Sequence, residues 1–358
     1  MRVLHVDTAR GWRGGQNQVL LTALGMTARG HDVTVACRAG GVLAARAKGA
    51  GLGVREIAFR GDLAPWAIPP LARVLREALP DVVQLHDPHA TSAGLLALRL
   101  TAQRPSLVAT RRVDFPLRGP FSRFKYRACQ RVIVVSRAIA SVLEADGLPE
   151  ERLRLVYEGV PDRPPAAGGE QALRSFGVPE GAPVVGNVAA LTDHKDHATL
   201  LEAAARVLEA VPAARFVIVG DGERRGRLEA RARELGLTGR VLFVGFRRDL
   251  DCLIPAFTVF CLSSHQEGLG TSLLDAMAFA RPIVATAAGG IPEAIEDGVT
   301  GRVVPVRRPE ALAAALLDLL TNAERRAALG AAGRRRYEER FTADRMVEAT
   351  LAVYAESR

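Results

Sequence analysis

Two series of short apolar runs, each alternating with segments of helical spacing, constrain the fold of this 358-residue chain more than any other feature. Runs rich in Val and Ile, without polar alternation, are typical of parallel strands covered on both faces. The first series comprises residues 3–6, 33–37, 82–85, 107–110 and 132–135. The second comprises residues 184–188, 216–219, 241–244, 259–262, 283–286 and 302–305. The pattern predicts an α/β chain with two tandem Rossmann-like domains.

A proline- and glycine-rich segment, residues 161–169, separates the two series. Because such a segment continues neither a strand nor a helix, we expect a linker here. We place the domains at residues 1–163 and 164–340, followed by a C-terminal helix within 341–358 that can cross back to the first domain. Ligands of open α/β sheets bind beyond the carboxyl ends of the strands, so the expected binding site is an interdomain cleft.

The most informative loop lies in the second series, just before a predicted helix, and carries acids eight positions apart. Its glycines let the backbone approach a ligand, and the amides at the helix start, which Thr271 or Ser272 can cap, favour a phosphate. Glu267 can accept hydrogen bonds from sugar hydroxyls. Asp275, one turn into the helix, faces the position that the ribose of a nucleotide takes when its diphosphate binds at the helix start. Alternatively, Ser272 and Asp275 form a capping box. The donor-binding candidates in this loop and helix are Glu267, Gly268, Leu269, Gly270, Thr271 and Asp275.

Lys195 is the only lysine of the second series in a chain that otherwise uses arginine, which indicates a need for a compact ammonium group. It follows the first strand of that series, where it can reach a diphosphate, and an exposed loop charge is the alternative. The sequence Asp-His-Lys-Asp-His at 193–197 suggests metal ligands. Adjacent residues on a short loop do not converge easily on one ion, however, and Asp196 is suited to cap the next helix. We therefore expect no metal and no other cofactor.

Other loops carry weaker candidates. Gly14 and Gly15 precede a helix and can contact a phosphate, or form a simple tight turn. No acid follows the second strand to hold a ribose, so a nicotinamide site is disfavoured. His86 follows a first-series strand and can bind an acceptor hydroxyl or merely end the strand. The remaining candidates are Arg112 after the strand at 107–110, Gly222 in a glycine-rich loop, and Phe246, beside which the backbone can hold a nucleobase.

The net charge of +9, from 48 basic and 39 acidic residues, is concentrated in part between residues 104 and 131. Asp114 is the single acid in this stretch. The basic residues are interleaved with Phe115, Phe121, Phe124 and Tyr126. Such a stretch can contact an anionic membrane, a phosphorylated acceptor or nucleic acid, or can be a solvated basic face. Of these partners we do not expect nucleic acid.

Several features bear on the location of the protein. No window reaches eighteen apolar residues, the first residues lack the pattern of a secretion signal, and four cysteines are scattered without CxxC spacing. Reduced thiols suit the cytoplasm. We expect a cytoplasmic protein that can also make peripheral contact with the inner face of the membrane.

With these residues in order along nearly its whole length, the chain resembles the retaining glycosyltransferases of family 4, which have the GT-B fold. The motifs that carry the resemblance are Gly14-Gly15, residues 29–33, Lys195, residues 220–223, the 267–275 segment, and residues 289–293 with 298–301. The resemblance implies that Glu267 contacts the donor sugar, Asp275 the ribose and Lys195 the diphosphate. It also implies that the first domain binds the acceptor and the second the nucleotide sugar.

The chain departs from the family pattern at three places. Ala190 stands where an arginine usually precedes the lysine, and Asp275 replaces a glutamate that is one methylene longer. The loop at 110–114 lacks the histidine that often lies near the reacting carbon. Arg112 of this loop can instead stabilise the leaving phosphate or bind an anionic acceptor, and no general base is assigned.

We predict a retaining, hexosyltransferase-like glycosyltransferase that uses a nucleotide-diphosphate sugar as co-substrate. Its acceptor is expected to be a glycan, a lipid-linked molecule or a small molecule, in the synthesis of cell-envelope glycans or glycolipids. The catalytic candidates are Glu267, Lys195, Arg112 and His86. Two alternatives remain open: a sugar-nucleotide 2-epimerase of GT-B fold, and a non-catalytic module that binds an anionic ligand.

Overall fold

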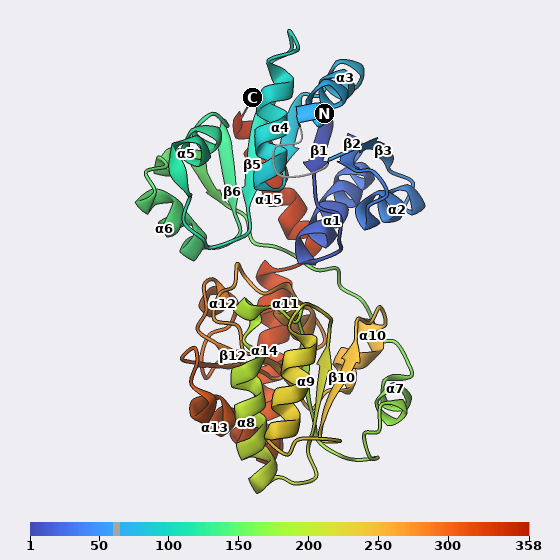
Figure 1. The fold of residues 1–358 in the computed structure, drawn as a ribbon, viewed down its shortest axis with the longest axis vertical. Helices are drawn as coiled ribbons and strands as arrows, with labels where there is room; N and C mark the ends of the chain where they lie inside the picture. Colours follow the sequence, from blue (N-terminus) through green and yellow to red (C-terminus); the bar gives the residue numbers. More distant parts are fainter. Residues whose placement is uncertain (60–64, 358) are drawn as a thin grey trace. The chain divides into compact units, whose positions relative to one another are not determined.

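The computed structural model describes residues 1–59 and 65–357. The chain divides into two compact units, each built around its own sheet (Figure 1). The first unit consists of Met1–Gly159 together with the C-terminal segment from Ala343 onward, and the second of Val160–Thr342. The predicted pair of Rossmann-like domains is therefore confirmed.

The first unit contains a seven-stranded parallel sheet of order β3-β2-β1-β4-β5-β6-β7. Its strands are β1 (Arg2–Asp7), β2 (Asp32–Arg38), β3 (Gly53–Ile57), β4 (Val82–Leu85), β5 (Ser106–Arg111), β6 (Arg131–Val134) and β7 (Leu153–Leu155). Its helices are α1 (Gly14–Ala28), α2 (Val42–Gly49), α3 (Ile68–Ala78), α4 (Pro88–Leu98), α5 (Gly119–Arg127), α6 (Arg137–Ala145) and α15 (Ala343–Ser357). The strand order reverses between β1 and β4, so the loops that follow these two strands adjoin.

Helix α15 packs against α1, β5 and β6. A Cβ atom on Gly25 of α1 would lie 2.6 Å from Val347 Cγ2, so the close approach of the two helices needs this glycine. Tyr354 is fully buried and donates its hydroxyl to Gln84 Oε1 on β4. These contacts explain why the C-terminal helix belongs to the first unit.

The second unit contains a six-stranded parallel sheet of order β10-β9-β8-β11-β12-β13. Its strands are β8 (Val184–Val188), β9 (Arg215–Val219), β10 (Val241–Gly245), β11 (Val259–Leu262), β12 (Ile283–Thr286) and β13 (Arg302–Val304). Its helices are α7 (Gly169–Ser175), α8 (His197–Ala210), α9 (Arg225–Glu234), α10 (Leu250–Leu253), α11 (Thr271–Ala278), α12 (Ile291–Ala294), α13 (Pro309–Thr321) and α14 (Ala323–Arg340). Here the strand order reverses between β8 and β11. A Cβ atom on Gly186 of β8 would lie 1.9 Å from a ring carbon of Phe257, so the packing of this ring needs a glycine.

The unit boundaries differ slightly from those expected, 163 and 340. The structure divides the chain after Gly159 and after Thr342. The reason is that Val160 already bonds within the second unit: its N–H donates to Phe341 O at 3.0 Å, and its carbonyl accepts from the Tyr337 hydroxyl at 3.0 Å. No helix in the described part of the chain combines the length and apolar character needed to cross a bilayer.

Candidate functional site

An ion pair lies at the strand reversal of the second unit. Lys195 ends a short 3-10 helix (Asp193–Lys195) after β8, and Glu267 lies in the loop after the neighbouring strand β11. Lys195 Nζ contacts Glu267 Oε2, and the two side chains are only 17% and 12% exposed. Ser264 Oγ donates to the same carboxylate oxygen at 3.2 Å. Two residues far apart in the sequence thus place opposite charges together where ligands of open α/β sheets bind.

Hydrogen bonds between the two loops fix the geometry of this pair. Ser263 Oγ donates to Lys195 O at 3.1 Å, and His265 N–H donates to His194 O at 2.9 Å. On the other side, Gly290 N–H, after β12, donates to Glu267 O at 3.1 Å. The loops after three adjacent strands are therefore linked by hydrogen bonds to the backbone around Lys195 and Glu267, which fixes the position of the charged pair. Asp196 caps α8 by accepting from Thr199 N–H, as predicted.

The start of α11 differs from the prediction. The helix begins at Thr271, and its N-cap is Gly270, in the left-handed conformation with φ of +89° and no side-chain hydrogen bond to the first turn. The expectation that Thr271 or Ser272 caps the helix was therefore wrong. A β-carbon at Gly270 would lie 2.9 Å from Leu273 Cδ1, so a glycine is favoured both by its conformation and by packing. Leu269 is buried, so its side chain packs inside the second unit.

Asp275, in the second turn of α11, is bonded to an arginine of the segment expected to be the linker. Arg163 donates to Asp275 Oδ1 at 3.2 Å and pairs with Asp251 at 3.0 Å. Burial raises the pKa of Asp275 to about 6, and the positive charge of Arg163 opposes this rise. The capping-box alternative is excluded, because the structure has no side-chain cap at this helix start.

The substitution Asp275→Asn tests the electrostatics of this carboxyl. Its pKa is higher in the folded than in the unfolded state, so its contribution to stability is full below its unfolded pKa near 4 and is lost as pH rises through about 6. The free energy of unfolding of the variant should therefore rise by about 2 kcal/mol relative to that of wild type between pH 4 and pH 7. Denaturant unfolding across this range measures the difference. Asp162→Asn is the control. Arg334 lowers the pKa of Asp162, so the free energy of unfolding of this variant should fall relative to that of wild type as pH rises. A pH-independent difference for Asp275→Asn would contradict the assignment.

The glycine-rich loop after β9 packs against the loop that follows β8. A Cβ atom on Gly222 would lie 2.5 Å from Leu191 O, so this glycine permits close backbone approach. Leu191 O accepts from Arg224 N–H at 3.0 Å, and the Arg224 guanidinium donates to Asp193 Oδ1 at 2.7 Å. Sequence reasoning did not select Arg224. Phe246, after β10, is 56% exposed, so its ring is accessible.

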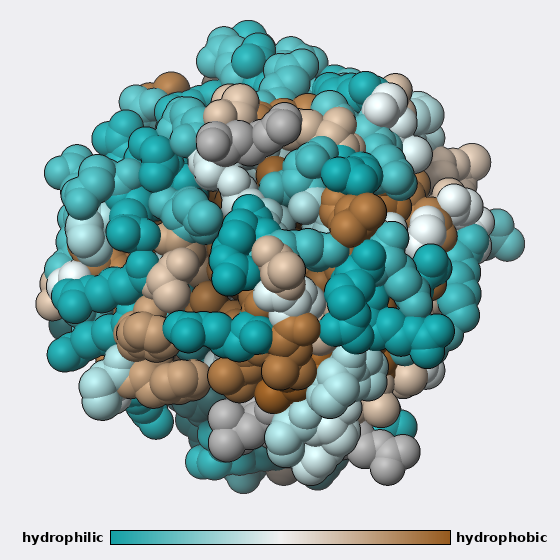
Figure 2. Space-filling view, turned by 90° about the horizontal axis from the view of Figure 1, so that it is seen from above, coloured by the Kyte–Doolittle hydropathy of each residue, from teal (hydrophilic) through white to brown (hydrophobic). Residues whose placement is uncertain are grey.

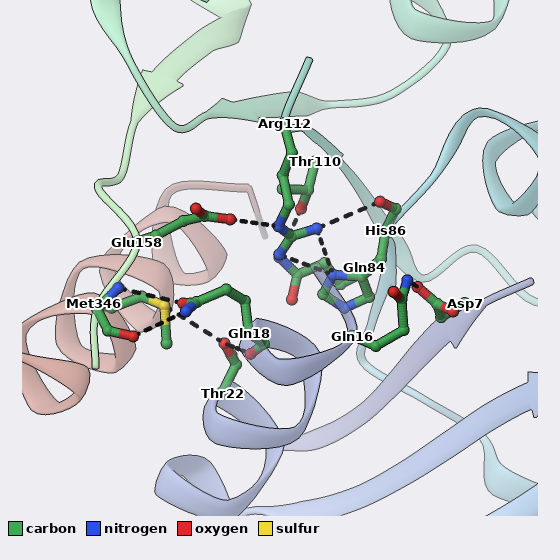
Figure 3. A network of polar contacts seen from close by, with 11 residues as sticks. Asp7, Gln16, Gln18, Thr22, Gln84, His86, Thr110, Arg112, Glu158 and Met346 are labelled. Carbon is green, nitrogen blue, oxygen red and sulfur yellow. Dashed lines mark hydrogen bonds and ion pairs between the residues drawn. The ribbon is translucent and has the colours of Figure 1, made fainter. Parts of the chain in front are cut away.

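The first unit has its own charged network at its strand reversal (Figure 3). Arg112, after β5, donates from Nε to Glu158 at 3.0 Å and from Nη1 to His86 Nδ1 at 3.3 Å. His86 Nε2 in turn lies 2.8 Å from His5 Nδ1 on β1. Because the guanidinium has no acceptor, His86 Nδ1 must accept and His86 Nε2 must donate to His5. Arg112 and Glu158 form a largely buried pair whose geometry the two histidines fix.

Both histidines of this network are neutral. Burial and the nearby Arg112 lower the pKa of His5 to about 3 and that of His86 well below its ordinary value. Both ring nitrogens of His86 are engaged, so in this structure His86 positions Arg112 and offers no free nitrogen to an acceptor. Its catalytic role stays a prediction. His5 and Glu158 were not selected from the sequence.

The glycine turn at the start of α1 adjoins this network. A Cβ atom on Gly15 would lie 3.6 Å from Arg112 Cδ, so the arginine stem packs on the helix start that Gly14 begins. Nearby, Asp7 accepts from Gln16 Nε2 at 3.0 Å, and burial and the neighbouring Asp87 raise its pKa to about 6. A guanidinium beside a helix N-terminus is an arrangement suited to an anion.

The described residues contain no group of three or more His, Cys, Asp or Glu side chains arranged to hold a metal ion. The two Rossmann-like units, each with a parallel sheet, make up the GT-B fold. Two family descriptions match the chain: Glycosyltransferase Family 4 over residues 12–163, and Glycosyl transferases group 1 over residues 170–336. The chain belongs to the family 4 glycosyltransferases.

Individual relatives agree with this family. The chain is 32% identical over 177 residues to the lipopolysaccharide core biosynthesis glycosyltransferase LpsE of Rhizobium meliloti, covering 49% of this chain and 51% of that one. It is 25% identical over 294 residues to N-acetyl-alpha-D-glucosaminyl L-malate synthase of Bacillus anthracis, covering 79% and 77%. The chain spans about half the length of several curated relatives. The crystal structure of Anabaena Alr3699/HepE in complex with UDP and glucose has the same fold, with a TM-score of 0.86, 22% identity, and 99% and 100% coverage.

Proposed function

We propose that this protein is a retaining hexosyltransferase that moves a sugar from a nucleotide-diphosphate sugar to an acceptor. The observation that carries the proposal is the Lys195–Glu267 pair at the strand reversal of the second unit, beside the start of α11. A cation and helix amides can bind a diphosphate, while a carboxylate can bind sugar hydroxyls. Glu267, Gly268, Leu269, Gly270 and Thr271 are the proposed donor contacts around this pair, with Gly14, Gly15, Gly222, Phe246 and Asp275 as further ones.

In the proposed reaction the bond between the sugar C1 and the diphosphate oxygen breaks, and the acceptor oxygen bonds to C1 on the same face. The departing phosphate takes the acceptor proton, so no protein nucleophile and no metal are needed. Lys195 stabilises the negative charge that develops on the diphosphate, and a partly buried setting strengthens this interaction. Glu267 orients the sugar through its carboxylate. UDP is the first nucleotide to test, because HepE was solved in complex with UDP.

Arg224 is our candidate for the positive charge that is missing at Ala190. Its backbone bonds to Leu191, the next residue after Ala190, and its guanidinium reaches Asp193, two residues before Lys195. A second cation at this edge of the sheet can share the charge of the diphosphate.

Arg224→Ala should raise the KM for the nucleotide sugar about tenfold and change kcat less, because this partly exposed cation contributes mainly to donor binding. Steady-state kinetics at varied donor concentration measures the effect. The matched control is Arg227→Ala, an exposed arginine three residues further along the chain. Equal kinetics of the two variants would contradict the role of Arg224.

The acceptor that we propose is a glycan, a lipid-linked saccharide or a small molecule, bound mainly by the first unit. Arg112 beside the start of α1 suits an acceptor or leaving group with negative charge. The similarity to LpsE supports a place in cell-envelope synthesis, and that to the malate synthase supports a small-molecule acceptor. We place the enzyme in the cytoplasm, in peripheral contact with the inner face of the membrane.

The experiment that tests this function is product analysis by mass spectrometry and NMR with UDP-glucose and UDP-N-acetylglucosamine, each with and without candidate acceptors. We expect UDP release and an α-linked product that depend on the acceptor. Isomerised nucleotide sugar formed without acceptor would favour the 2-epimerase. Absence of turnover with retained binding of anionic polymers would favour the non-catalytic module.

A further inference from the structure

We propose that a pocket at the amino-terminal edge of the sheet in the second unit binds a small soluble molecule that carries a phosphate group. This inference goes beyond the sugar-transfer function and does not depend on it. The pocket has a volume of about 380 Å³, which suits a small molecule rather than a polymer. We call it the β11–β12 pocket, and its lining includes Thr258, Ala280, Arg281, Ala323, Arg326 and Ala327.

The β11–β12 pocket lies away from the proposed donor site within the same unit. Thr258 directly precedes β11 and Pro282 directly precedes β12, so the pocket adjoins the ends at which these parallel strands begin. The loops that hold Lys195 and Glu267 follow the opposite ends of β8 and β11. Because β11 has 4 residues, roughly 13 Å of strand separates the two places. A nucleotide at the donor site therefore does not fill this pocket.

Arg281 lines the pocket from the end of α11. Its Nε donates to Phe279 O at 3.1 Å, and its Nη1 donates to Pro255 O at 3.1 Å. Burial lowers the pKa of Arg281, because its charge is partly removed from water. Within residues 1–59 and 65–357 no carboxylate pairs with this guanidinium. By contrast, Arg302 and Arg336 of the same unit both pair with acids.

Arg326 lines the pocket from the first turn of α14. Its Nη1 donates to Leu319 O at 2.7 Å and to Leu320 O at 2.9 Å, at the end of α13. These bonds fix the guanidinium and leave its Nε and Nη2 without a partner in the described part of the chain. The carbonyl groups at a helix end carry only about half an elementary charge, so they offset part of each guanidinium charge. The pocket therefore keeps a net positive charge.

Two further groups in the pocket favour an anion. Ala323 and Ala327 place the pocket against the amino-terminal turns of α14, where the helix dipole is positive. Thr258 Oγ accepts from Val184 N–H at 2.9 Å, so its hydroxyl hydrogen can donate to a ligand. None of the described residues that line the pocket is acidic, and Glu324 of the same helix turn is exposed outside the lining.

The wall of the pocket around Arg281 is held rigidly. Ala280 has the left-handed conformation, with φ of +52°, although it is not a glycine. Its N–H donates to Met277 O at 2.9 Å, and Arg281 N–H donates to Ala276 O at 2.9 Å, which closes the end of α11. A Cβ atom on Gly330 of α14 would lie 2.3 Å from Ala280 O, so α14 packs directly on this turn. Binding therefore requires little ordering of the Arg281 backbone.

A phosphate group matches the charge of this pocket. Hydrophilic residues cover most of the face of the molecule in Figure 2, so a charged side chain in contact with solvent needs no ligand by itself. The pocket differs because two partly buried guanidinium groups, those of Arg281 and Arg326, line one hollow without an acid. A phosphate monoester carries about two negative charges at pH 7, and its oxygens accept forked hydrogen bonds from arginine. A carboxylate carries a single charge and leaves one guanidinium unpaired.

Isothermal titration calorimetry of the whole chain with inorganic phosphate and with glucose 6-phosphate tests the proposal. We expect binding of these probes and none of glucose, which lacks the phosphate. Ala327→Glu should weaken binding about tenfold or more, because it places a negative charge at the pocket wall. The matched control is Ala328→Glu, the same change at the next exposed position and outside the lining, which should bind like wild type. Both variants should fold, since a glutamate suits an early helix turn, and melting temperatures check this.

Removing the cations gives an independent arm of the test. Arg281→Gln with Arg326→Gln should weaken binding about tenfold or more, because charge-assisted hydrogen bonds are lost. Arg335→Gln, at an exposed position of α14 outside the lining, is its control. Lys195→Met should keep the binding of glucose 6-phosphate, which separates this pocket from the donor site. Binding of neither phosphate probe, equal affinities of Ala327→Glu and Ala328→Glu, or loss of binding in Lys195→Met would each overturn the proposal.

Discussion

Replacing Lys195 with methionine is expected to lower kcat/KM for the nucleotide sugar about a thousandfold, because a charge that stabilises the leaving diphosphate in a partly buried site is lost. The substitution also leaves the Glu267 carboxylate, 12% exposed, without its cation. Methionine retains most of the aliphatic volume, so the loss reports mainly on charge. Initial rates at varied donor concentration, with melting temperature as a check of folding, measure the effect.

A matched control and a double variant make this result specific. Lys48→Met makes the same chemical change at an exposed Lys–Glu pair in the first unit, and should leave the rate unchanged. Glu267→Gln alone should also reduce turnover strongly. Because Lys195 and Glu267 act on one ligand, the double variant should lose much less than the product of the two single losses. Wild-type rates in Lys195→Met would rule out the proposed site.

Arg112→Lys is expected to lower kcat about a hundredfold while nucleotide binding is retained. The guanidinium bonds to Glu158 and His86 at once, and an ammonium group on a flexible stem cannot reproduce this fork. A loss confined to kcat with an unchanged affinity for nucleotide would show that the first-unit network acts in the transfer step. Single-turnover transfer and nucleotide titration separate the two quantities.

The conservative change keeps the positive charge, so the buried Glu158 retains a partner and the variant should fold. Arg104→Lys, at an exposed position of the same unit, is the control and should behave as wild type. An unaltered kcat in Arg112→Lys would contradict the account of this network.

The sheets could be predicted from the sequence because their central strands are continuous apolar runs. Strands β4 and β5 are buried at every position, and their apolar runs mark them clearly. Strand β3 was not predicted because it lies at the sheet edge and its residues are mostly exposed. Strand β7 was missed because its three residues, at the opposite edge, are too few to show a period.

The site could be predicted only in part. Lys195 and Glu267 stood out as a lone lysine and as an acid beside glycines, but their contact depends on β8 lying next to β11, which no local pattern encodes. Arg163 appeared only as part of a linker, although it bonds to Asp275 more than a hundred residues away. His5 lies inside a strand and looks like any of its buried residues. Partners that come from distant segments carry no signal in a single sequence.

The most direct test of the central claim is the melting temperature of wild type and Lys195→Met with UDP, GDP and ADP. A ligand that binds only the folded protein raises its melting temperature. We expect a rise with one of these nucleotides in wild type and little or none in Lys195→Met. No rise with any of the three, or an equal rise in the variant, would contradict a nucleotide site built on Lys195 and Glu267.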